Sequence, residues 1–156
     1  MDTTEMREAR KSVMILIADD DEDDRMFTKE AFEENYLLNE IRFVNDGVEL
    51  LDYLKRRNKY INPDDSPRPG IILLDLNMPK MDGREALKAI KSDPDLWAIP
   101  VVVLTTSKAE QDVLQTYDLG VNCFITKPVS FAEFIEVART VGHYWFDIVQ
   151  LPNSLD

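Results

Sequence analysis

The chain has 156 residues and a formal net charge of −12, because 30 Asp and Glu outnumber 18 Lys and Arg. Its length suits one domain with a hydrophobic core, and its negative field disfavours nucleic acid as a partner. The single cysteine, Cys123, cannot form an internal disulfide, the N-terminus lacks the apolar segment of a signal peptide, and no apolar run is long enough to span a bilayer. We therefore expect a cytoplasmic protein that binds neither a membrane nor a nucleic acid.

The first half of the chain alternates strand-like and helix-like segments. Residues 13–18 (VMILIA) are a continuous aliphatic run, typical of a strand buried on both faces, and residues 23–38 carry apolar side chains at helical spacing. A short strand is expected over 41–44 and an amphipathic helix over 45–57. The next segment, 58–70, is rich in Pro, Asp and Asn and is predicted to be a surface loop.

The second half repeats this alternation. Strands are expected over 71–75 (IILLD), 101–104 (VVVL) and 122–126 (NCFIT), with helices over 83–93 and 110–120 between them. The pattern therefore continues strand by helix up to the final segment of the chain.

A last helix is expected to begin at Ser130, where Glu133 three residues on is typical of a capping box, and to end before Pro152. Five strands that alternate with five helices predict a parallel sheet with helices on both faces, joined by right-handed crossovers. In such sheets, binding sites form at the carboxyl ends of the strands, near the switch in strand order. Function is therefore expected at those strand ends.

Acidic side chains stand at the ends of two predicted strands. Asp19 and Asp20 come directly after the first strand, and Asp75 ends the third. Two carboxylates about 4 Å apart repel by roughly 4 kcal/mol at an effective dielectric of about 20, so three together need a cation or protons. Oxygen ligands suit Mg²⁺, and the sequence predicts a magnesium site made of these carboxylates and the backbone carbonyl of Asn77.

A hydroxyl and an amine come from the remaining strand ends. Thr105 follows the fourth strand, and Lys127 follows the fifth. A lysine is a compact point charge suited to one phosphoryl oxygen, and a threonine can donate a hydrogen bond to another. The set predicts a phosphoryl-binding site in which Asp75 is the nucleophile, with Pro79 and Gly83 shaping the loop that follows it.

Four segments in order, ILIADD, LLDLNMPKMDG, VVVLTTS and FITKP, make the chain resemble the receiver domain of two-component response regulators. The resemblance implies a flavodoxin-like, doubly wound (βα)5 fold with a five-stranded parallel sheet of order 2-1-3-4-5. It places the receiver domain at residues 13–151, between an N-terminal extension (1–12) and a C-terminal tail (152–156), with no output domain.

The resemblance also implies roles for single residues. Asp75 is expected to be phosphorylated, Asp19 and Asp20 to be the acid pair that binds Mg²⁺, and Lys127 to contact the phosphoryl group. The peptide bond before Pro128 is expected to be cis. These expectations define a phosphoacceptor signalling domain that promotes only its own phosphorylation and dephosphorylation.

Two further residues match the family's switch. Thr105 is expected to move toward the phosphoryl group, which vacates space for Phe124 to turn inward. Phe124 lacks the hydroxyl of the more common tyrosine, so its inward state forms one hydrogen bond fewer. Thr106 is larger than the usual residue at its position, and it narrows access to the phosphoaspartate.

The LTTS strand end, the 58–70 loop and the C-terminal helix are similar to the phytochrome-associated subgroup of receivers. This similarity implies a sensor histidine kinase, of phytochrome-like type, as the phosphoryl donor. With no output domain expected, regulation is predicted to run through a protein partner, through a homodimer formed by the last helix, or through passage of the phosphoryl group to a downstream phosphotransfer protein.

Three other functions are weighed against this interpretation, and particular residues argue against two of them. A phosphatase with an aspartate nucleophile would need a second acid at Asn77, and a degenerate receiver would act as a constitutive interaction module. An EF-hand calcium loop starting at Asp19 is disfavoured because Asp24 occupies the position that requires glycine. The acids at 22–24 are expected to be solvated residues favoured by the helix dipole.

Overall fold

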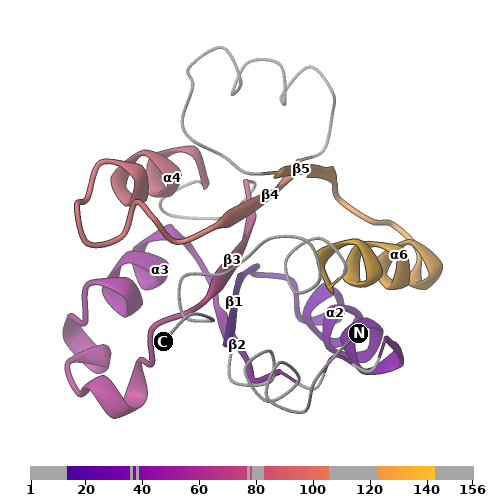
Figure 1. The fold of residues 1–156 in the computed structure, drawn as a ribbon, viewed down its shortest axis with the longest axis horizontal. Helices are drawn as coiled ribbons and strands as arrows, with labels where there is room; N and C mark the ends of the chain where they lie inside the picture. Colours follow the sequence, from indigo (N-terminus) through magenta and orange to yellow (C-terminus); the bar gives the residue numbers. More distant parts are fainter. Residues whose placement is uncertain are drawn as a thin grey trace, which may run out of the picture.

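The protein is described by a computed structural model that covers residues 14–35, 37, 39–76, 78, 83–105 and 123–142. Within these ranges lie strands and α-helices in alternation, followed through the chain in Figure 1: β1 (Ile15–Ala18), α2 (Glu22–Glu34), β2 (Ile41–Val44), α3 (Gly47–Leu54), β3 (Ile71–Asp75), α4 (Gly83–Lys91), β4 (Val101–Thr105), β5 (Cys123–Thr126) and α6 (Phe131–Gly142). The helix expected over 110–120 lies outside the described residues.

The strands form one parallel sheet of five strands in the order β2-β1-β3-β4-β5. Ile15 of β1 pairs with Ile41 of β2 and with Ile71 of β3, and Val102 of β4 pairs with Cys123 of β5. Parallel neighbours require a crossover, and the helices provide it. The flavodoxin-like, doubly wound fold expected from the sequence is thereby confirmed.

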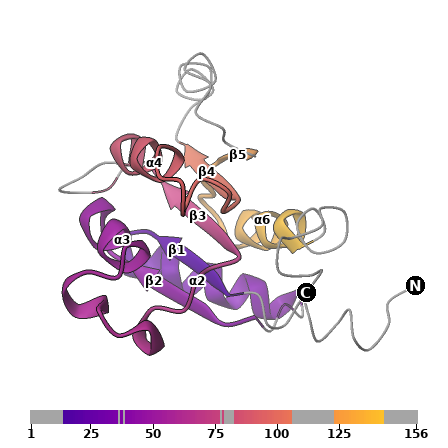
Figure 2. The same cartoon turned by 60° about the vertical axis from the view of Figure 1, so that its left-hand side comes forward.

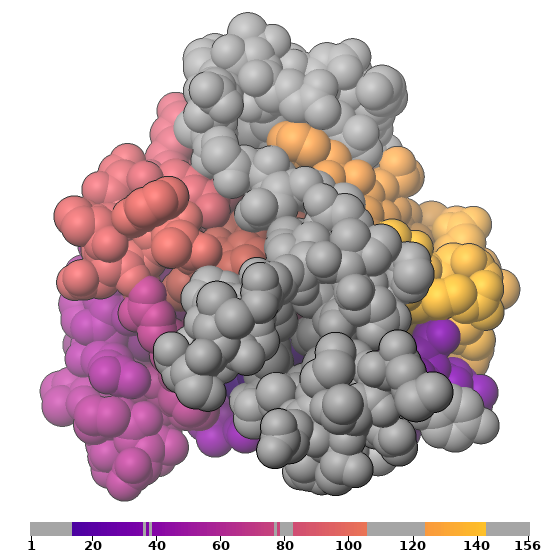
Figure 3. All heavy atoms as spheres, viewed as in Figure 1, coloured from indigo at the N-terminus to yellow at the C-terminus, as the bar shows by residue number. Residues whose placement is uncertain are grey.

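Helices cover both faces of the sheet, which explains why the strands are continuous aliphatic runs. In Figures 1 and 2, α3 and α4 lie on one face, and α2 and α6 lie on the other. The space-filling view separates the same pairs, with α3 and α4 on one side and α6 on the opposite side (Figure 3). Alternate residues of each strand pack into two clusters: Leu16, Ile72 and Val103 face α3 and α4, whereas Ile17 and Leu73 face α2 and α6.

Helix α2 is shorter than the sequence pattern suggested. Its N-cap is Asp21, whose carboxylate accepts a hydrogen bond from the Asp24 N–H at 3.0 Å. It ends at Glu34 because the side chain of Asn35 donates to the Ala31 carbonyl at 2.9 Å and to the Ile135 carbonyl of α6 at 3.1 Å. The same side chain that ends α2 therefore joins it to α6.

Helix α6 begins where the capping box was predicted. The Ser130 hydroxyl accepts from the Glu133 N–H at 3.2 Å, while the Glu133 carboxylate accepts from the Val129 N–H at 2.9 Å. Phe27 of α2 packs against the rings of Phe131 and Phe134, with centroids 6.1 and 5.8 Å apart. The part of this helix expected after Gly142 lies outside the described residues.

The segment predicted as a surface loop contains two short 3₁₀ turns, η1 (Asn58–Tyr60) and η2 (Pro63–Asp65). Tyr60 anchors it, because its ring meets Tyr53 edge-on at 5.0 Å and its hydroxyl donates to Glu49 at 3.0 Å. Among the described helices, none combines the length and apolar character needed to cross a bilayer.

Candidate functional site

The candidate site lies at the carboxyl ends of the central strands, where the fold class predicts it. Asp75 is the last residue of β3, is 1% exposed, and pairs with Leu104 of β4. The N–H of Leu76 continues this pairing by donating to the Leu104 carbonyl at 3.2 Å. The backbone of Asp75 is therefore fixed by the buried strand β3 and by its pairing with β4.

Three carboxylates converge at this end of the sheet. Asp19, Asp20 and Asp75 each offer an oxygen, and these oxygens all lie within 4.8 Å of one another. Asp19 is 2% exposed and accepts a hydrogen bond from the Asp21 N–H at 3.0 Å, whereas Asp20 is exposed. Close oxygens of this kind suit a hard divalent cation that keeps some of its water. The acids singled out in the sequence are therefore brought together in a set that fits such an ion.

Burial is the main cause of the raised pKa of Asp19. Loss of solvation raises the pKa of the Asp19 carboxyl to about 6, and the nearby charges of Asp75 and Asp24 add to the increase. The hydrogen bond from Asp21 and the charge of Lys127 act in the opposite direction. Without a metal, the Asp19 carboxylate therefore takes up a proton as the pH falls through about 6.

Lys127 lies among these acids. Its Nζ atom is 2.7 Å from Asp75 Oδ2, 3.0 Å from Asp24 Oδ2 and 3.6 Å from Asp19 Oδ2. Burial alone would lower the pKa of the ammonium group, but hydrogen bonds to Asp75 and Asp24 raise it above its ordinary value. The backbone N–H of Lys127 also donates to the Thr105 carbonyl at 2.7 Å. This bond to the end of β4 fixes the position of the Lys127 backbone.

Asp24 is a site residue that the sequence interpretation missed. Glu22 and Asp23 are exposed, as expected for acids near a helix N-terminus, but Asp24 is half-buried and binds Lys127. The cap at Asp21 makes Asp24 the third residue of the helix, which turns its carboxylate toward the ends of the strands. The Asp21 capping pattern is the one signal in the sequence that could have separated Asp24 from its neighbours.

The remaining predicted residues fall partly inside the described region. Thr105 ends β4 and is fully buried, and Phe124 is half-buried against the cluster under α3 and α4. Thr106 and Asn77 lie outside the described residues. No cis peptide occurs in the described part of the chain, so the bond before Pro128 is trans and the expected cis bond is wrong; the trans form is the intrinsically preferred one.

The loop after Asp75 returns through a close backbone contact at Gly83. Its N–H donates to the Leu76 carbonyl at 3.0 Å. A Cβ atom at this position would lie 2.6 Å from Leu76 Cα and 2.8 Å from the Asp75 carbonyl oxygen. Glycine is therefore required here, as the sequence suggested, while Pro79 lies outside the described residues.

Known proteins are similar in sequence to this chain over most of its length. Residues 15–139 match the family model of the response regulator receiver domain. The chain is 39% identical over 147 residues to response regulator Rcp1 of Synechocystis sp., which covers 94% of this chain and 98% of that protein. It is 35% identical over 145 residues to the probable methanogenesis regulatory protein FilR2 of Methanothrix harundinacea, covering 93% and 91% of the two chains.

Solved structures share the fold as well as the sequence. The crystal structure of the phosphorylated cyanobacterial phytochrome response regulator RcpA has a TM-score of 0.80 at 40% identity, covering 90% of this chain and 99% of that one. The Mn²⁺-bound form of response regulator Rcp1 has a TM-score of 0.78 at 39% identity, with coverage of 90% and 99%. The chain therefore belongs to the response-regulator receiver domains, two-component signalling proteins whose general function is phosphorylation of an aspartate with the help of a divalent cation.

Proposed function

We propose that Asp75 is the phosphoryl acceptor of this receiver domain. The observation that carries the proposal is the contact of 2.7 Å between Lys127 Nζ and Asp75 Oδ2, inside a group of carboxylates that could hold a metal. Asp75 is itself the last residue of β3, the central strand of the sheet, whereas Asp19 and Asp20 follow the end of β1. A nucleophile needs this kind of fixed position, because catalysis of phosphoryl transfer is mostly positioning and charge stabilisation.

The proposed donor is a phosphohistidine of a sensor histidine kinase. A carboxylate oxygen of Asp75 attacks the phosphorus atom, the phosphorus–nitrogen bond breaks, and its electron pair returns to the imidazole of the kinase. The product is an acyl phosphate on Asp75, and attack by water on that phosphorus regenerates the carboxylate and releases inorganic phosphate. Lys127 stabilises the transferring group because its ammonium already lies at hydrogen-bonding distance from the acceptor oxygen.

Mg²⁺ is the proposed ion for the carboxylate cluster. Asp19, Asp20 and Asp75 would hold it, together with the backbone carbonyl of Asn77. When bound, the ion offsets negative charge on the phosphoryl oxygens and on the carboxylates. The Asp19 carboxylate must be ionised to act as a ligand, so its raised pKa makes metal affinity increase as the pH rises through about 6.

The proposed output is a two-state switch. Thr105 moves toward the phosphoryl group and Phe124 turns inward, with Thr106 limiting access to the acyl phosphate. The resulting surface would act through a homodimer formed by the last helix or through a downstream phosphotransfer protein, in the cytoplasm. A phytochrome-like kinase is proposed as the partner because one neighbour is described as a cyanobacterial phytochrome response regulator and another as a regulator in red light signaling of R. palustris.

The experiment is phosphorylation by a small phosphodonor, acetyl phosphate, in Mg²⁺, followed by intact-mass measurement. The unchanged protein should gain one phosphoryl group, whereas Asp75→Asn and a sample in excess EDTA should gain none. Asp93→Asn is the matched control, because it removes an acid far from the strand ends and should behave like wild type. Full labelling of Asp75→Asn would overturn the proposal, and multiple turnovers of a free phosphoester would favour the phosphatase alternative.

A further inference from the structure

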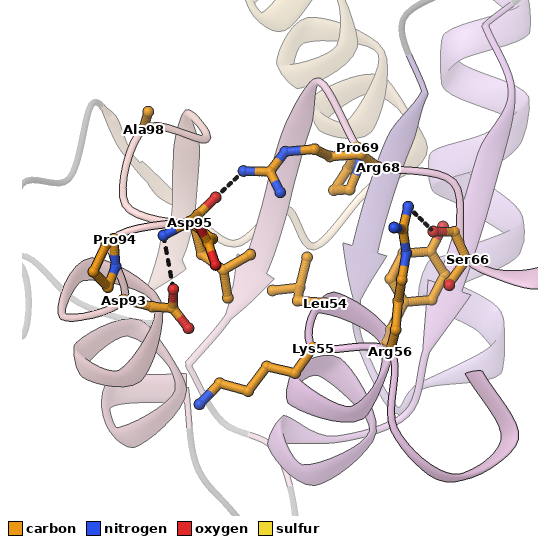
Figure 4. Close-up of a pocket in the computed structure, with 12 residues that line it drawn as sticks. Leu54, Lys55, Arg56, Ser66, Arg68, Pro69, Asp93, Pro94, Asp95 and Ala98 are labelled. Atoms are coloured by element: carbon orange, nitrogen blue, oxygen red, sulfur yellow. Dashed lines mark hydrogen bonds between the residues drawn. The ribbon is translucent and has the colours of Figure 1, made fainter. Parts of the chain in front are cut away.

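A second hollow lies at the opposite end of the sheet from Asp75. It has a volume of about 720 Å³ and opens between the end of α3, the segment that leads into β3, and the connection from α4 to β4. Figure 4 shows Leu54 in its middle, with Lys55, Arg56 and Arg68 reaching its edges. Pro69 lines it and precedes β3, whereas Asp75 ends β3, so the strand separates the two sites. Small-molecule pockets typically have volumes of about 300–1,000 Å³.

The cations at this pocket lack carboxylate partners. Arg56 donates to the Ser66 carbonyl at 3.4 Å, and Arg68 donates to the Asp95 carbonyl, so both guanidinium groups bond only to neutral oxygens in the described structure (Figure 4). The Lys55 ammonium has no hydrogen bond or ion pair with any described residue. Elsewhere in the described residues cations pair with carboxylates, for example Arg42 with Glu40, Arg57 with Asp52, Lys59 with Glu49, and Arg139 with Glu136. Arg25 and Lys91 bond to neutral oxygens, as the pocket arginines do, but neither lines this pocket.

Arg56 also occupies a backbone position that disfavours it. Helix α3 ends in a Schellman motif, in which the Arg57 N–H donates to the Asp52 carbonyl at 2.8 Å and the Arg56 N–H to the Tyr53 carbonyl at 3.3 Å. The residue after the C-cap in this motif is left-handed, and Arg56 has φ of 53°. Glycine is the usual residue there, because a Cβ atom is disfavoured at positive φ. The side chain of this arginine lines the pocket, where its guanidinium donates to the Ser66 carbonyl.

The rest of the lining gives the pocket an apolar floor and an acidic rim. Leu96, which is 2% exposed, contributes apolar surface together with Leu54, Pro69 and Pro94. Asp93 and Asp95 stand on the side opposite Arg56 in Figure 4, where one Asp93 oxygen accepts from the Asp95 N–H at 2.8 Å. A carboxylate has further acceptor positions, so these two acids can still receive hydrogen bonds from a ligand's hydroxyl groups.

We propose that this pocket binds a small anionic molecule of the nucleoside-phosphate class. The phosphate groups contact Lys55, Arg56 and Arg68, the base packs on the apolar floor, and the sugar hydroxyls donate to Asp93 or Asp95. Arginine suits phosphate because its planar fork donates two parallel hydrogen bonds. The pocket shares no lining residue with the acidic site.

The test is binding of ATP to the full chain, measured by titration calorimetry and by thermal unfolding in EDTA on an Asp75→Asn background. EDTA and that substitution remove the metal and acceptor chemistry of the other site. ATP should bind and raise the melting temperature, since a ligand that binds only the folded state stabilises it. Adenosine and inorganic phosphate, each tested alone, should bind about tenfold or more weakly, because each keeps only part of the contacts.

Arg56→Gly is the decisive variant, because it should lower the affinity for ATP without lowering the stability of the fold. It relieves the left-handed position, so the melting temperature without ligand should stay equal or rise, yet ATP affinity should fall about tenfold or more. Asn58→Gly is the matched control: it also replaces a residue of positive φ, 55°, but it does not line the pocket, so ATP affinity should be unchanged. Arg68→Gln should lower the affinity for ATP, as Arg56→Gly does.

Three results would overturn the proposal. The first is no ATP binding by the folded protein at millimolar concentration. The second is ATP binding that Arg56→Gly and Arg68→Gln leave unchanged, since the ligand would then lie elsewhere. The third is equal affinity for ATP and inorganic phosphate, which would show that only an anion is recognised and that the apolar floor takes no part.

Discussion

The two ends of the sheet show opposite arrangements of charge. At the carboxyl end, one lysine lies among carboxylates, with Lys127 Nζ within 3.6 Å of Asp75, Asp24 and Asp19. At the amino end, Lys55, Arg56 and Arg68 border a pocket and find only main-chain carbonyls or no described partner. Net charge alone describes neither end, because a chain of −12 gathers an excess of acids at one end and, at the other, three cations beside the two acids Asp93 and Asp95. The comparison teaches that each end is suited to a ligand of opposite charge: a cation at the first and an anion at the second.

The largest expected effect concerns the cation of the acidic end. Lys127→Ala should slow phosphorylation by acetyl phosphate about 100-fold, the size expected when a positioned charge is removed from a transition state. The same change should strengthen Mg²⁺ binding, because it removes a cation that competes for Asp75. Intact-mass time courses and calorimetric Mg²⁺ titration measure the two effects.

Lys29→Ala is the control for that experiment, because Lys29 is an exposed lysine of α2. It should leave the phosphorylation rate and the Mg²⁺ affinity unchanged. A Lys127→Ala protein that phosphorylates within about threefold of wild type would show that the short contact to Asp75 has no part in transfer.

The backbone differs between the two ends as much as the charge does. Gly83→Ala should destabilise the fold by about 2–3 kcal/mol, because the new methyl group would meet the backbone of Leu76 and Asp75. Gly142→Ala should cost less, because the three described atoms nearest its methyl group belong to the flexible Leu37 side chain. Urea unfolding of both variants gives the difference, and an equal loss at the two glycines would contradict the backbone account. At the amino end the expectation reverses, since Arg56→Gly removes strain.

A pH dependence separates the acidic end from the rest of the molecule. The pKa of Asp19 rises from 3.8 to about 6 on folding, so the folded state holds this proton more tightly than the unfolded state does. That contribution to stability is present below the unfolded pKa and is lost as pH rises through the folded one, which is the window from about 4 to 6.

Asp19→Asn should therefore be more stable than wild type at pH 7 in EDTA by roughly 2–3 kcal/mol, since one pKa unit corresponds to about 1.4 kcal/mol. Near pH 4 the two proteins should have nearly equal free energies of unfolding. Urea denaturation at several pH values measures the difference between them. A gap that stays constant with pH would show that the Asp19 pKa is ordinary.

The smallest expected effect tests the residue that only the structure revealed. Asp24→Asn removes a carboxylate that competes with the phosphoryl group for Lys127. At saturating Mg²⁺, phosphorylation should become about two- to fivefold faster, the size expected for a partly exposed ion pair. Asp23→Asn is the control, since Asp23 is an exposed neighbour, and its rate should match wild type. Slower phosphorylation in Asp24→Asn alone would mean that Asp24 supports transfer.

The acidic site was predictable because the order and direction of the strands determine where most of its side chains lie. Continuous aliphatic runs identify buried parallel strands, and parallel strands bring their carboxyl ends to one edge of the sheet. Asp19, Asp75 and Lys127 each follow such a run, so their convergence follows from the fold alone. The glycine at 83 was likewise marked by its position after the acceptor strand.

The features that the sequence did not reveal depend on local geometry. Asp24 was not separated from Glu22 and Asp23, because all three suit a helix N-terminus and only a cap at Asp21, which sets the exact start of α2, distinguishes the one that turns inward. The left-handed Arg56 was missed because an arginine carries no turn signal, unlike the glycine that the position favours. The amino-end pocket combines side chains from three connections, whose conformations no periodic pattern predicts.

The acceptor role of Asp75 can be tested directly by locating the phosphoryl group. Borohydride reduces an aspartyl phosphate to homoserine, so the protein phosphorylated with acetyl phosphate and Mg²⁺ would be reduced, digested and sequenced by tandem mass spectrometry. The account predicts homoserine at position 75 and aspartate at positions 19, 20 and 24. Homoserine at one of those other acids, with unmodified Asp75, would contradict it.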